Sequence, residues 1–361
     1  MVFRSEIEHK LLPLFLSKKC VILDVPAYPN VGDQLIWAGM EDFFRSNKID
    51  CVYRSSCHTF TYREFTTDTI ICLVGGGNFG DLWRGLQEFK NRIVQLYPNN
   101  KIVIFPQSVY YSDISLCNFD SKIFAQHNGI YICARDVESF VFLQQHFKNE
   151  VLLVPDMVLY LSFDRSVEGI KHKKLFLQRD DKEMVDYTKW LNDDMVVCDW
   201  PTHKTIDKIR IDAFMKRNKW AHRIFRLGVQ YIKNVALLKY FYKGCSFRLF
   251  CRINDNKRSI SERWEMIYME INYLLYLNKK YLGRLNEIIN KLLHIYHLPL
   301  IHQYAIEFMQ DYDEVYTTRL HGGILAMMLG KKVRLVDNNY GKISALYRTW
   351  LLNEPNIEMI D

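Results

Sequence analysis

The stretch Thr317-Thr318-Arg319-Leu320-His321-Gly322-Gly323 lies between two apolar runs, residues 315–316 and residues 324–329. This pattern predicts a strand, a sharp turn and then a helix that ends near Gly330. Arg319 and His321 are therefore expected at the point where a strand gives way to a helix. Free backbone N–H groups at such a point favour an anion, and an arginine adds a bidentate donor for phosphate or carboxylate. The alternative interpretation is a surface arginine and a capping histidine on an ordinary turn.

Two stretches nearer the N-terminus show the same design. Residues 21–25 form an apolar run that is followed by Pro29-Asn30-Val31-Gly32-Asp33 and an amphipathic segment. Residues 70–74 form another run, followed by Gly75-Gly76-Gly77-Asn78-Phe79-Gly80-Asp81 and the helix-compatible residues 82–96. In an open α/β sheet, such strand-to-helix turns line the crevice at the carboxyl ends of the strands.

Several short motifs occur along the chain in a defined order. They are Asn30-Val31-Gly32-Asp33, the glycine turn that ends in Asp81, Ala134-Arg135-Asp136 with Ser139, Arg179-Asp180-Asp181-Lys182-Glu183, Arg319-Leu320-His321-Gly322 and Asp337-Asn338-Asn339-Tyr340-Gly341-Lys342. In this order and spacing they resemble the polysaccharide pyruvyltransferase family. The resemblance covers residues 20–183 and 313–350, which is most of the chain outside a central block.

Short apolar runs alternate with helical patterns in the first half of the chain. Strands are expected over residues 20–25, 49–53, 69–74, 101–105, 130–133 and 151–154, and helices over residues 34–47, 82–97, 121–128 and 137–147. This alternation predicts a parallel sheet that is buried on both faces. We therefore expect residues 1–165 to form an N-terminal Rossmann-like domain.

A second domain is predicted over residues 166–361, after a charged linker at residues 164–174. Its expected strands are residues 175–178, 195–199, 314–316 and 332–336, and its expected helices are residues 261–278, 285–296, 322–329 and 346–352. The fold class is therefore α/β, with two Rossmann-like domains. The family resemblance implies that these domains face each other across a cleft, as in B-type glycosyltransferases, and that the last helix returns to the first domain.

Composition favours a folded protein and argues against several classes. The chain has 361 residues, of which 49% are hydrophobic and 25% charged, so about two domains are expected. The first apolar run, residues 11–16, is short and is interrupted by Pro13, so no signal peptide is predicted. No apolar run approaches the length that crosses a bilayer. The nine cysteines include no Cys-x-x-Cys pair, so we expect reduced thiols in the cytoplasm, without disulfides or a zinc site.

Basic residues concentrate in the centre of the chain. Residues 204–252 contain thirteen Lys or Arg and two Asp, whereas the net charge of the whole chain is +7. Apolar residues recur at helical spacing over residues 220–242, so a basic helical insertion is predicted near residues 204–260. One interpretation is a helix that packs on its own domain. The other is attachment to an anionic membrane surface at the inner face of the membrane. Nucleic acid is not expected, because no binding motif accompanies the charge.

The donor that the resemblance implies is phosphoenolpyruvate, whose phosphate and carboxylate require several cationic donors. The predicted catalytic residues are His321, Arg319 and Arg179. The predicted substrate-binding residues are Asn30, Gly32, Asp33, Gly75, Gly76, Gly77, Asn78, Asp81, Leu320, Gly322 and Lys342. For Arg179 the alternative role is a surface ion pair, and for the two aspartates it is the capping of a helix. No metal site is predicted.

The resemblance implies ketal formation, in which the pyruvyl group is joined to two hydroxyls of one sugar and phosphate is released. His321 is the expected general acid, and no cofactor is needed. The expected partners are phosphoenolpyruvate and a glycan or lipid-linked saccharide acceptor. A B-type glycosyltransferase that uses a nucleotide sugar is the alternative enzyme, and a non-catalytic binding protein is a third hypothesis. The glycine turn matches neither the dinucleotide fingerprint nor a Walker loop.

Overall fold

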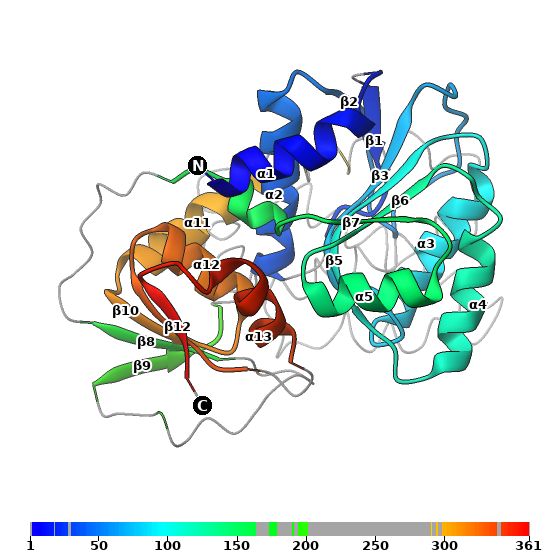
Figure 1. Cartoon of the computed structure of the whole chain (residues 1–361). Coiled ribbons are helices and arrows are strands. Elements are labelled where there is room, and N and C mark those ends of the chain that lie inside the picture. The colour runs from blue at the N-terminus through cyan, green and yellow to red at the C-terminus, as the bar shows by residue number, and fades with distance from the viewer. Residues whose placement is uncertain are drawn as a thin grey trace, which may run out of the picture. The chain divides into compact units, whose positions relative to one another are not determined.

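The computed structural model describes residues 2–17, 19–27, 30–163, 173–178, 190, 194–200, 290, 294, 298–337 and 341–360. These residues form an α/β fold with two parallel sheets, one of seven strands and one of five (Figure 1). The predicted α/β class with two Rossmann-like sheets is therefore confirmed. The predicted linker, the basic insertion and the helices expected at residues 261–278 and 285–296 lie wholly or mostly outside the described residues.

The first sheet has the strand order β2-β1-β3-β5-β6-β7, and β4 pairs with the far end of β5. Its strands are β1 (Lys19–Ile22), β2 (Asp50–Arg54), β3 (Ile70–Leu73), β4 (Gly76–Gly80), β5 (Ile102–Tyr110), β6 (Ile130–Ala134) and β7 (Glu150–Leu153). Every pairing in the sheet is parallel. Six of these strands lie close to predicted positions, because their apolar runs mark them clearly.

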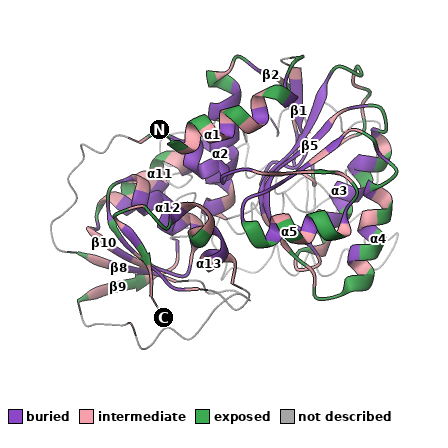
Figure 2. Cartoon of the chain, viewed as in Figure 1, coloured by how far each residue is buried: buried purple, intermediate pink, exposed green. Residues whose placement is uncertain are grey.

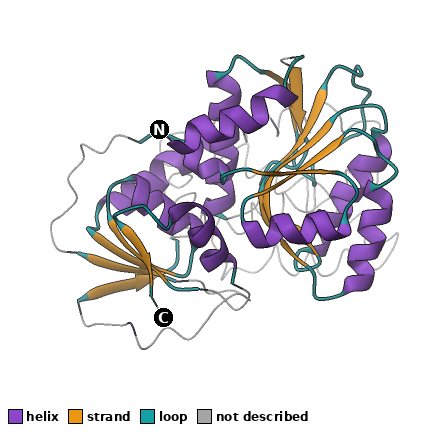
Figure 3. Ribbon diagram, viewed as in Figure 1, coloured by secondary structure: helices purple, strands orange, loops and turns teal. Residues whose placement is uncertain are grey.

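Helices cover both faces of the first sheet, as the burial of alternate strand residues shows. Val103 and Phe105 pack with α1 (Val2–Leu11), α2 (Val31–Ser46) and η2 (Met157–Tyr160), whereas Ile102 and Ile104 pack with the opposite layer. That layer consists of α3 (Arg84–Leu96), α4 (Ile114–Phe124) and α5 (Val137–His146). Figures 2 and 3 show the buried sheet and its two helical layers. The strands are therefore buried on both faces, as a parallel sheet requires.

Two local predictions in this half are wrong. The glycine stretch after β3 does not lead directly into a helix but forms the extra strand β4. Gly80 adopts φ +120°, and a Cβ there would lie 1.8 Å from the carbonyl oxygen of Tyr110, so only glycine allows this close pairing. The helix expected at residues 121–128 instead begins at Ile114, because the Asp113 side chain accepts a hydrogen bond from the Ser115 N–H and caps it.

The second sheet has the order β12-β11-β10-β8-β9, and its pairings are also parallel. Its strands are β8 (Lys174–Leu177), β9 (Met195–Cys198), β10 (Glu314–Thr317), β11 (Lys332–Leu335) and β12 (Ile357–Met359). Helices α11 (Leu298–Gln310) and α12 (Leu320–Met328) pack with it, and α13 (Lys342–Leu346) continues into a π-helical turn, Tyr347–Leu351. The sequence analysis had not predicted α1, α11 or β12.

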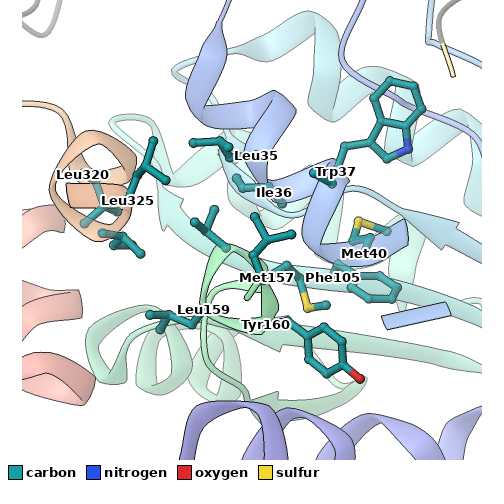
Figure 4. Packing of buried hydrophobic residues seen from close by; sticks show 14 of the residues in the cluster. Leu35, Ile36, Trp37, Met40, Phe105, Met157, Leu159, Tyr160, Leu320 and Leu325 are labelled. Atoms are coloured by element: carbon teal, nitrogen blue, oxygen red, sulfur yellow. The ribbon is translucent and has the colours of Figure 1, made fainter. Parts of the chain in front are cut away.

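One hydrophobic cluster joins helices from both sheets. Leu35 and Ile36 of α2 belong to it together with Met157 of η2 and Leu320 and Leu325 of α12 (Figure 4). Close backbone packing supports this cluster, since a Cβ at Gly39 of α2 would lie 1.9 Å from the Met157 carbonyl oxygen. The first turns of α2 and α12 are thereby brought together, and these two turns carry the residues singled out in the sequence.

The chain divides into a compact unit of residues 1–200 and 287–361, which holds both sheets, and a second unit of residues 201–286. The second unit lies outside the described residues.

The C-terminal segment contacts the first turn of α5. The Val137 N–H donates to Thr349 Oγ1 at 3.2 Å, and Arg348 Nη2 lies 2.7 Å from Glu138 Oε1. The boundary near residue 165 stays a prediction.

Candidate active site

His321 lies in the first turn of α12, and the preceding turn is tightly fixed. Thr317 Oγ1 accepts a hydrogen bond from the Arg319 N–H at 2.8 Å and donates one to the Leu177 carbonyl oxygen at 2.8 Å. Gly322 faces the second sheet, where a Cβ would lie 2.4 Å from Leu177 Cδ2. Glycine therefore lets α12 pack closely on β8, so that the position of His321 is set by the sheet beneath it.

Two buried charged side chains contact the imidazole of His321. Its Nε2 lies 3.2 Å from Asp156 Oδ2 and 3.1 Å from Arg135 Nη1. Arg135 Nη1 is also 2.7 Å from Asp156 Oδ2, so the three groups form a closed triangle. The side chains of Arg135 and Asp156 are 1% and 0% exposed, whereas that of His321 is 12% exposed. The histidine is thus the member of the triangle that a ligand can reach.

Asp156 follows β7 and has two separate functions. Its Oδ1 accepts a hydrogen bond from the Val158 N–H at 2.9 Å and caps η2, which leaves Oδ2 for His321 and Arg135. Burial alone would raise the pKa of the Asp156 carboxyl, but His321 and Arg135 together with the Val158 N–H lower this pKa overall. The carboxylate is therefore ionised at neutral pH.

Arg135 is anchored at the end of β6 by contacts along its whole length. Its backbone N–H donates to the Gln107 carbonyl oxygen at 3.0 Å, and its carbonyl oxygen accepts a hydrogen bond from Trp350 Nε1 at 2.8 Å. Its Nε donates to Ser108 Oγ at 2.8 Å, and Ser108 in turn donates to Asp136 Oδ2 at 2.6 Å. These contacts fix the guanidinium at the carboxyl end of the first sheet.

The first turn of α2 lies directly against His321. Asn30 caps this helix, because its Oδ1 accepts a hydrogen bond from the Gly32 N–H at 3.0 Å, and its Nδ2 donates to Asp33 Oδ2 at 2.9 Å. A Cβ at Gly32 would lie 2.6 Å from His321 Nδ1. Glycine at this position is therefore required for the imidazole to pack here. The structure brings Asn30, Gly32, Asp33 and His321 together.

The glycine stretch and Lys342 approach the same group of residues. A Cβ at Gly76 would lie 3.5 Å from Asp33 Oδ1. A Cβ at Gly77 would lie 3.5 Å from Arg135 Nη2 and 3.8 Å from Lys342 Nζ. Gly75 instead packs beneath the site, where a Cβ would lie 2.6 Å from the carbonyl oxygen of Pro106. Arg135 and Lys342 therefore provide two cationic groups beside the glycine backbone.

Of the two predicted catalytic arginines, Arg319 lies within the described residues and Arg179 does not. Arg319 forms a two-point ion pair with Asp199, which follows β9, and its Nε lies 2.5 Å from Asp199 Oδ1. Both side chains are largely buried. Arg179 lies outside the described residues, although β8 ends at Leu177, two positions before it. Any anion that binds Arg319 has to share this guanidinium with Asp199.

Three other predicted residues make contacts within the fold. Asn78 Oδ1 accepts a hydrogen bond from Lys90 Nζ at 2.7 Å. Asp81 Oδ2 accepts hydrogen bonds from the Ser112 N–H, the Ser112 hydroxyl and the Asp113 N–H at 2.7–2.8 Å, and so joins the loops that follow β4 and β5. Leu320 is buried in the core cluster. None of these contacts involves His321.

Two buried groups near the glycine stretch were missed. Asp24 follows β1 and accepts a hydrogen bond from the Val74 N–H, and Lys90 Nζ lies 4.0 Å from its other oxygen. Burial raises the pKa of the Asp24 carboxyl to about 6 despite Lys90 and the Val74 N–H, and burial also lowers the pKa of Lys90. The available signal for Asp24 was a carboxylate inside the apolar run of residues 20–25, and for Asp156 it was a carboxylate shortly after the apolar residues 151–154.

Two features are absent from the described part of the chain. No group of three or more His, Cys, Asp or Glu side chains within it is arranged to hold a metal ion. No helix within the same ranges is both long and apolar enough to cross a membrane.

Sequence comparisons with known proteins indicate one family. The family model for polysaccharide pyruvyl transferase matches residues 30–340. A Bacillus subtilis (strain 168) protein with the provisional name pyruvyl transferase EpsO is 28% identical over 346 residues, which is 95% of this chain and 89% of that protein. Pyruvyl transferase 1 of Schizosaccharomyces pombe is 31% identical over 181 residues, covering 46% of this chain and 45% of the relative. A crystal structure of an uncharacterized Klebsiella pneumoniae protein shares the fold, with a TM-score of 0.54 and 17% identity over 100% of this chain and 99% of that one.

Proposed function

The chain belongs to the polysaccharide pyruvyl transferase family, and from this premise we propose that it transfers the pyruvyl group of phosphoenolpyruvate onto two hydroxyls of one sugar. The product is a pyruvate ketal, and phosphate is released. The acceptor in this proposal is a surface or capsular polysaccharide or its lipid-linked precursor.

The observation that carries the proposal is the contact of His321 with the first turn of α2 and with the Arg135–Asp156 pair. His321, which is partly exposed and follows a strand of the second sheet, thereby contacts residues that follow strands of the first sheet. Lys342 and Arg135 lie beside the glycine backbone, and Arg319 directly precedes the histidine helix. This arrangement suits a small donor with two anionic groups, because it gathers cationic side chains around His321.

In the proposed reaction, His321 gives a proton to the methylene carbon of phosphoenolpyruvate. The neighbouring carbon becomes oxocarbenium-like, one sugar hydroxyl attacks it, and a C–O bond forms. The bond between this carbon and the phosphate oxygen breaks, and phosphate departs with the bonding electrons. The second hydroxyl then closes the ring. The two hydroxyl protons balance the one taken up by carbon and the one carried away by phosphate. Arg319 and Arg179 are the proposed cations for the departing phosphate.

The acceptor needs hydrogen-bonding groups rather than charge. Asn30 and Asp33 present an amide and a carboxylate at the start of α2, and such groups commonly hold sugar hydroxyls. We propose that the acceptor binds on this side, with the two Rossmann-like sheets arranged as in B-type glycosyltransferases. The basic segment 204–252 is the proposed contact with an anionic membrane in the cytoplasm, and it lies outside the described residues.

The test measures donor use against a panel of glycosides that each have two free hydroxyls. Phosphate release from phosphoenolpyruvate should depend on the glycoside, and the glycoside should gain the mass of pyruvic acid less one water. A parallel reaction with nucleotide sugars tests the glycosyltransferase alternative. Nucleotide release there, without phosphate release from phosphoenolpyruvate, would overturn the proposal. Binding of phosphoenolpyruvate without turnover on a proven acceptor would support a binding protein instead.

A further inference from the structure

Arg135 belongs to a sequence motif with no predicted role in the reaction, and Asp156 lies outside every predicted motif. We propose that Asp156, together with Arg135, is a positioning unit that holds His321 through Nε2 and makes Nδ1 the nitrogen that exchanges its proton with the substrate. This inference rests on the proposed function for its chemical meaning. Which ring nitrogen of His321 carries the proton can be tested without turnover.

The direction of the hydrogen bonds follows from which groups can accept. Arg135 is only a donor, and its shorter Nη1 contact is with Asp156 Oδ2, at 2.7 Å, rather than with His321 Nε2, at 3.1 Å. An ionised carboxylate is the stronger acceptor of the two. Oδ2 also lies 3.2 Å from Nε2 and can accept a hydrogen bond from it. His321 therefore donates from Nε2, and Nε2 keeps its proton.

Nδ1 faces the opposite way, toward the first turn of α2. The position that a Gly32 Cβ would occupy is 2.6 Å from Nδ1, whereas Asp156 and Arg135 contact Nε2. Other charged groups described around the site are Asp33, held by Asn30, Arg319, which is paired with Asp199, and Lys342, beside Gly77. Nδ1 is thus the ring nitrogen on the side of the candidate substrate residues.

With this assignment, the atoms that give and receive the proton are defined in each step. In the charged ring, the Nδ1–H bond breaks as the C–H bond to the donor's methylene carbon forms. The neutral ring that remains has its proton on Nε2, where Asp156 already accepts it, so no rotation of the ring is required. An attacking hydroxyl can then return a proton to Nδ1. Asp156 keeps its charge throughout and acts only on the orientation and protonation of His321.

The direct test is a pH titration of protein labelled with nitrogen-15 in its eleven histidines, with the His321 signals assigned from His321→Gln. We expect deprotonation at Nδ1, with Nε2 protonated at every pH. A neutral form of His321 with its proton on Nδ1 would overturn the proposal. The titration needs no change at Asp156, so it decides the proposal even where variants at that position do not fold.

Asp156→Asn sharpens the test. The amide oxygen should keep the cap on the Val158 N–H, which turns the amide NH₂ toward His321 Nε2 and makes this nitrogen an acceptor. We expect the neutral proton to move to Nδ1, kcat to fall on the order of a hundredfold, and the affinity for phosphoenolpyruvate to change little. The pH profile of kcat should change as well, because the charged ring has lost its carboxylate partner.

Asp120→Asn is the matched control, since Asp120 is another buried carboxylate paired with an arginine, Arg84, away from His321. It should leave the His321 spectrum and the pH profile unchanged. If Asp156→Asn and Asp120→Asn behave alike in both readouts, Asp156 supports only the fold. Failure of the proposed function is a different result, because the tautomer can be as predicted in a protein that transfers no pyruvyl group.

Discussion

Two arginine–aspartate pairs with fully buried carboxylates differ in the other groups that contact the carboxylate. Asp120 of α4 receives both Nη1 and Nη2 of Arg84, at 2.6 and 2.8 Å, and its remaining acceptor capacity is taken by Asn91 Nδ2 and the Tyr111 hydroxyl. All of its partners come from the first sheet and its helices. Burial and Asp120 raise the pKa of Tyr111, so no partner of this carboxylate changes its charge near neutral pH.

The Arg135–Asp156 pair is completed by a histidine instead. Asp156 shares one oxygen between Arg135 and His321, and His321 comes from a helix of the second sheet. An imidazole can change its charge near neutral pH, unlike the partners of Asp120. A buried carboxylate with only fixed donors therefore supports the fold, whereas one shared with a titratable ring can serve proton transfer.

The largest effect is expected from His321→Gln. It removes the proposed acid but leaves Arg135 and Asp156 paired, so kcat should fall about a hundredfold or more. The affinity for phosphoenolpyruvate should change much less. Steady-state rates with calorimetric donor binding measure both quantities. Turnover close to wild type would show that the Arg135–Asp156 pair, like the Arg84–Asp120 pair, does not serve proton transfer.

Arg319→Ala is expected to act on donor binding. The substitution removes a proposed phosphate contact and leaves Asp199 without its two-point ion pair. We expect the affinity for phosphoenolpyruvate to fall by about 2 kcal/mol or more, roughly thirtyfold. Asp199→Asn provides the control, because it frees Arg319 without removing it. Unchanged donor affinity in Arg319→Ala would mean that this arginine serves Asp199 alone.

Gly32→Ala tests the contact between α2 and His321. The new methyl group would lie 2.6 Å from Nδ1, so the ring has to move away from its position beside Asp156. A displacement of this kind should lower kcat by about tenfold or more. Gly85→Ala in α3 is the matched control, because nothing lies within 4 Å of its Cβ position. The control should be neutral or stabilise the protein by up to about 1 kcal/mol. Equal kinetics in the two variants would contradict the contact.

Asp120→Asn is expected to change stability rather than turnover. It weakens a buried pair in which Arg84 loses its charged partner, so the free energy of unfolding should fall by about 3 kcal/mol. Denaturant unfolding measures this loss, while kcat and the donor affinity should stay near wild type at permissive temperature. A large loss of turnover in the folded variant would show that the pair closed within the first sheet also serves the reaction.

The smallest effect on turnover is expected at Glu41, whose two oxygens bind Arg54 Nε and Nη2 at 2.6 and 2.7 Å. Burial would raise the pKa of Glu41, but Arg54 and His294 lower it to about 2. Because the folded pKa lies below the ordinary value, the stabilisation is present above about pH 4.5 and is lost as the pH falls toward 2. Glu41→Gln should therefore flatten the stability profile in this acidic range. An unchanged acid-unfolding curve would contradict the shift.

Local sequence patterns predicted much of the fold. Apolar runs located six strands of the first sheet, and capping residues such as Asn30 explain where α2 begins. The glycine strand β4 could not be predicted, because its residues have low strand propensity and its pairing depends on close approach to Tyr110. The start of α4 was missed although Asp113 and Ser115 carry a local capping signal.

Local sequence patterns marked several residues of the candidate site, but they did not mark Asp156 and did not show which residues pair. His321, Asn30 and Gly32 stand in local patterns that mark the ends of strands. Asp156 and His321 are in contact although they lie 165 residues apart in the sequence. Arg319 and Asp199 form an ion pair although they lie 120 residues apart. No local periodicity contains these pairings. They arise because parallel strands bring their carboxyl ends to one edge of a sheet, whatever their separation along the chain.

Pyruvyl transfer is tested directly by the structure of the product formed from phosphoenolpyruvate and a glycoside in deuterated water. Proton transfer to the methylene carbon followed by attack of two hydroxyls predicts a quaternary ketal carbon and a methyl group that carries one deuterium, both visible by NMR. A product that retains the methylene group as an enol ether, or one that carries an added sugar instead of pyruvate, would contradict the account.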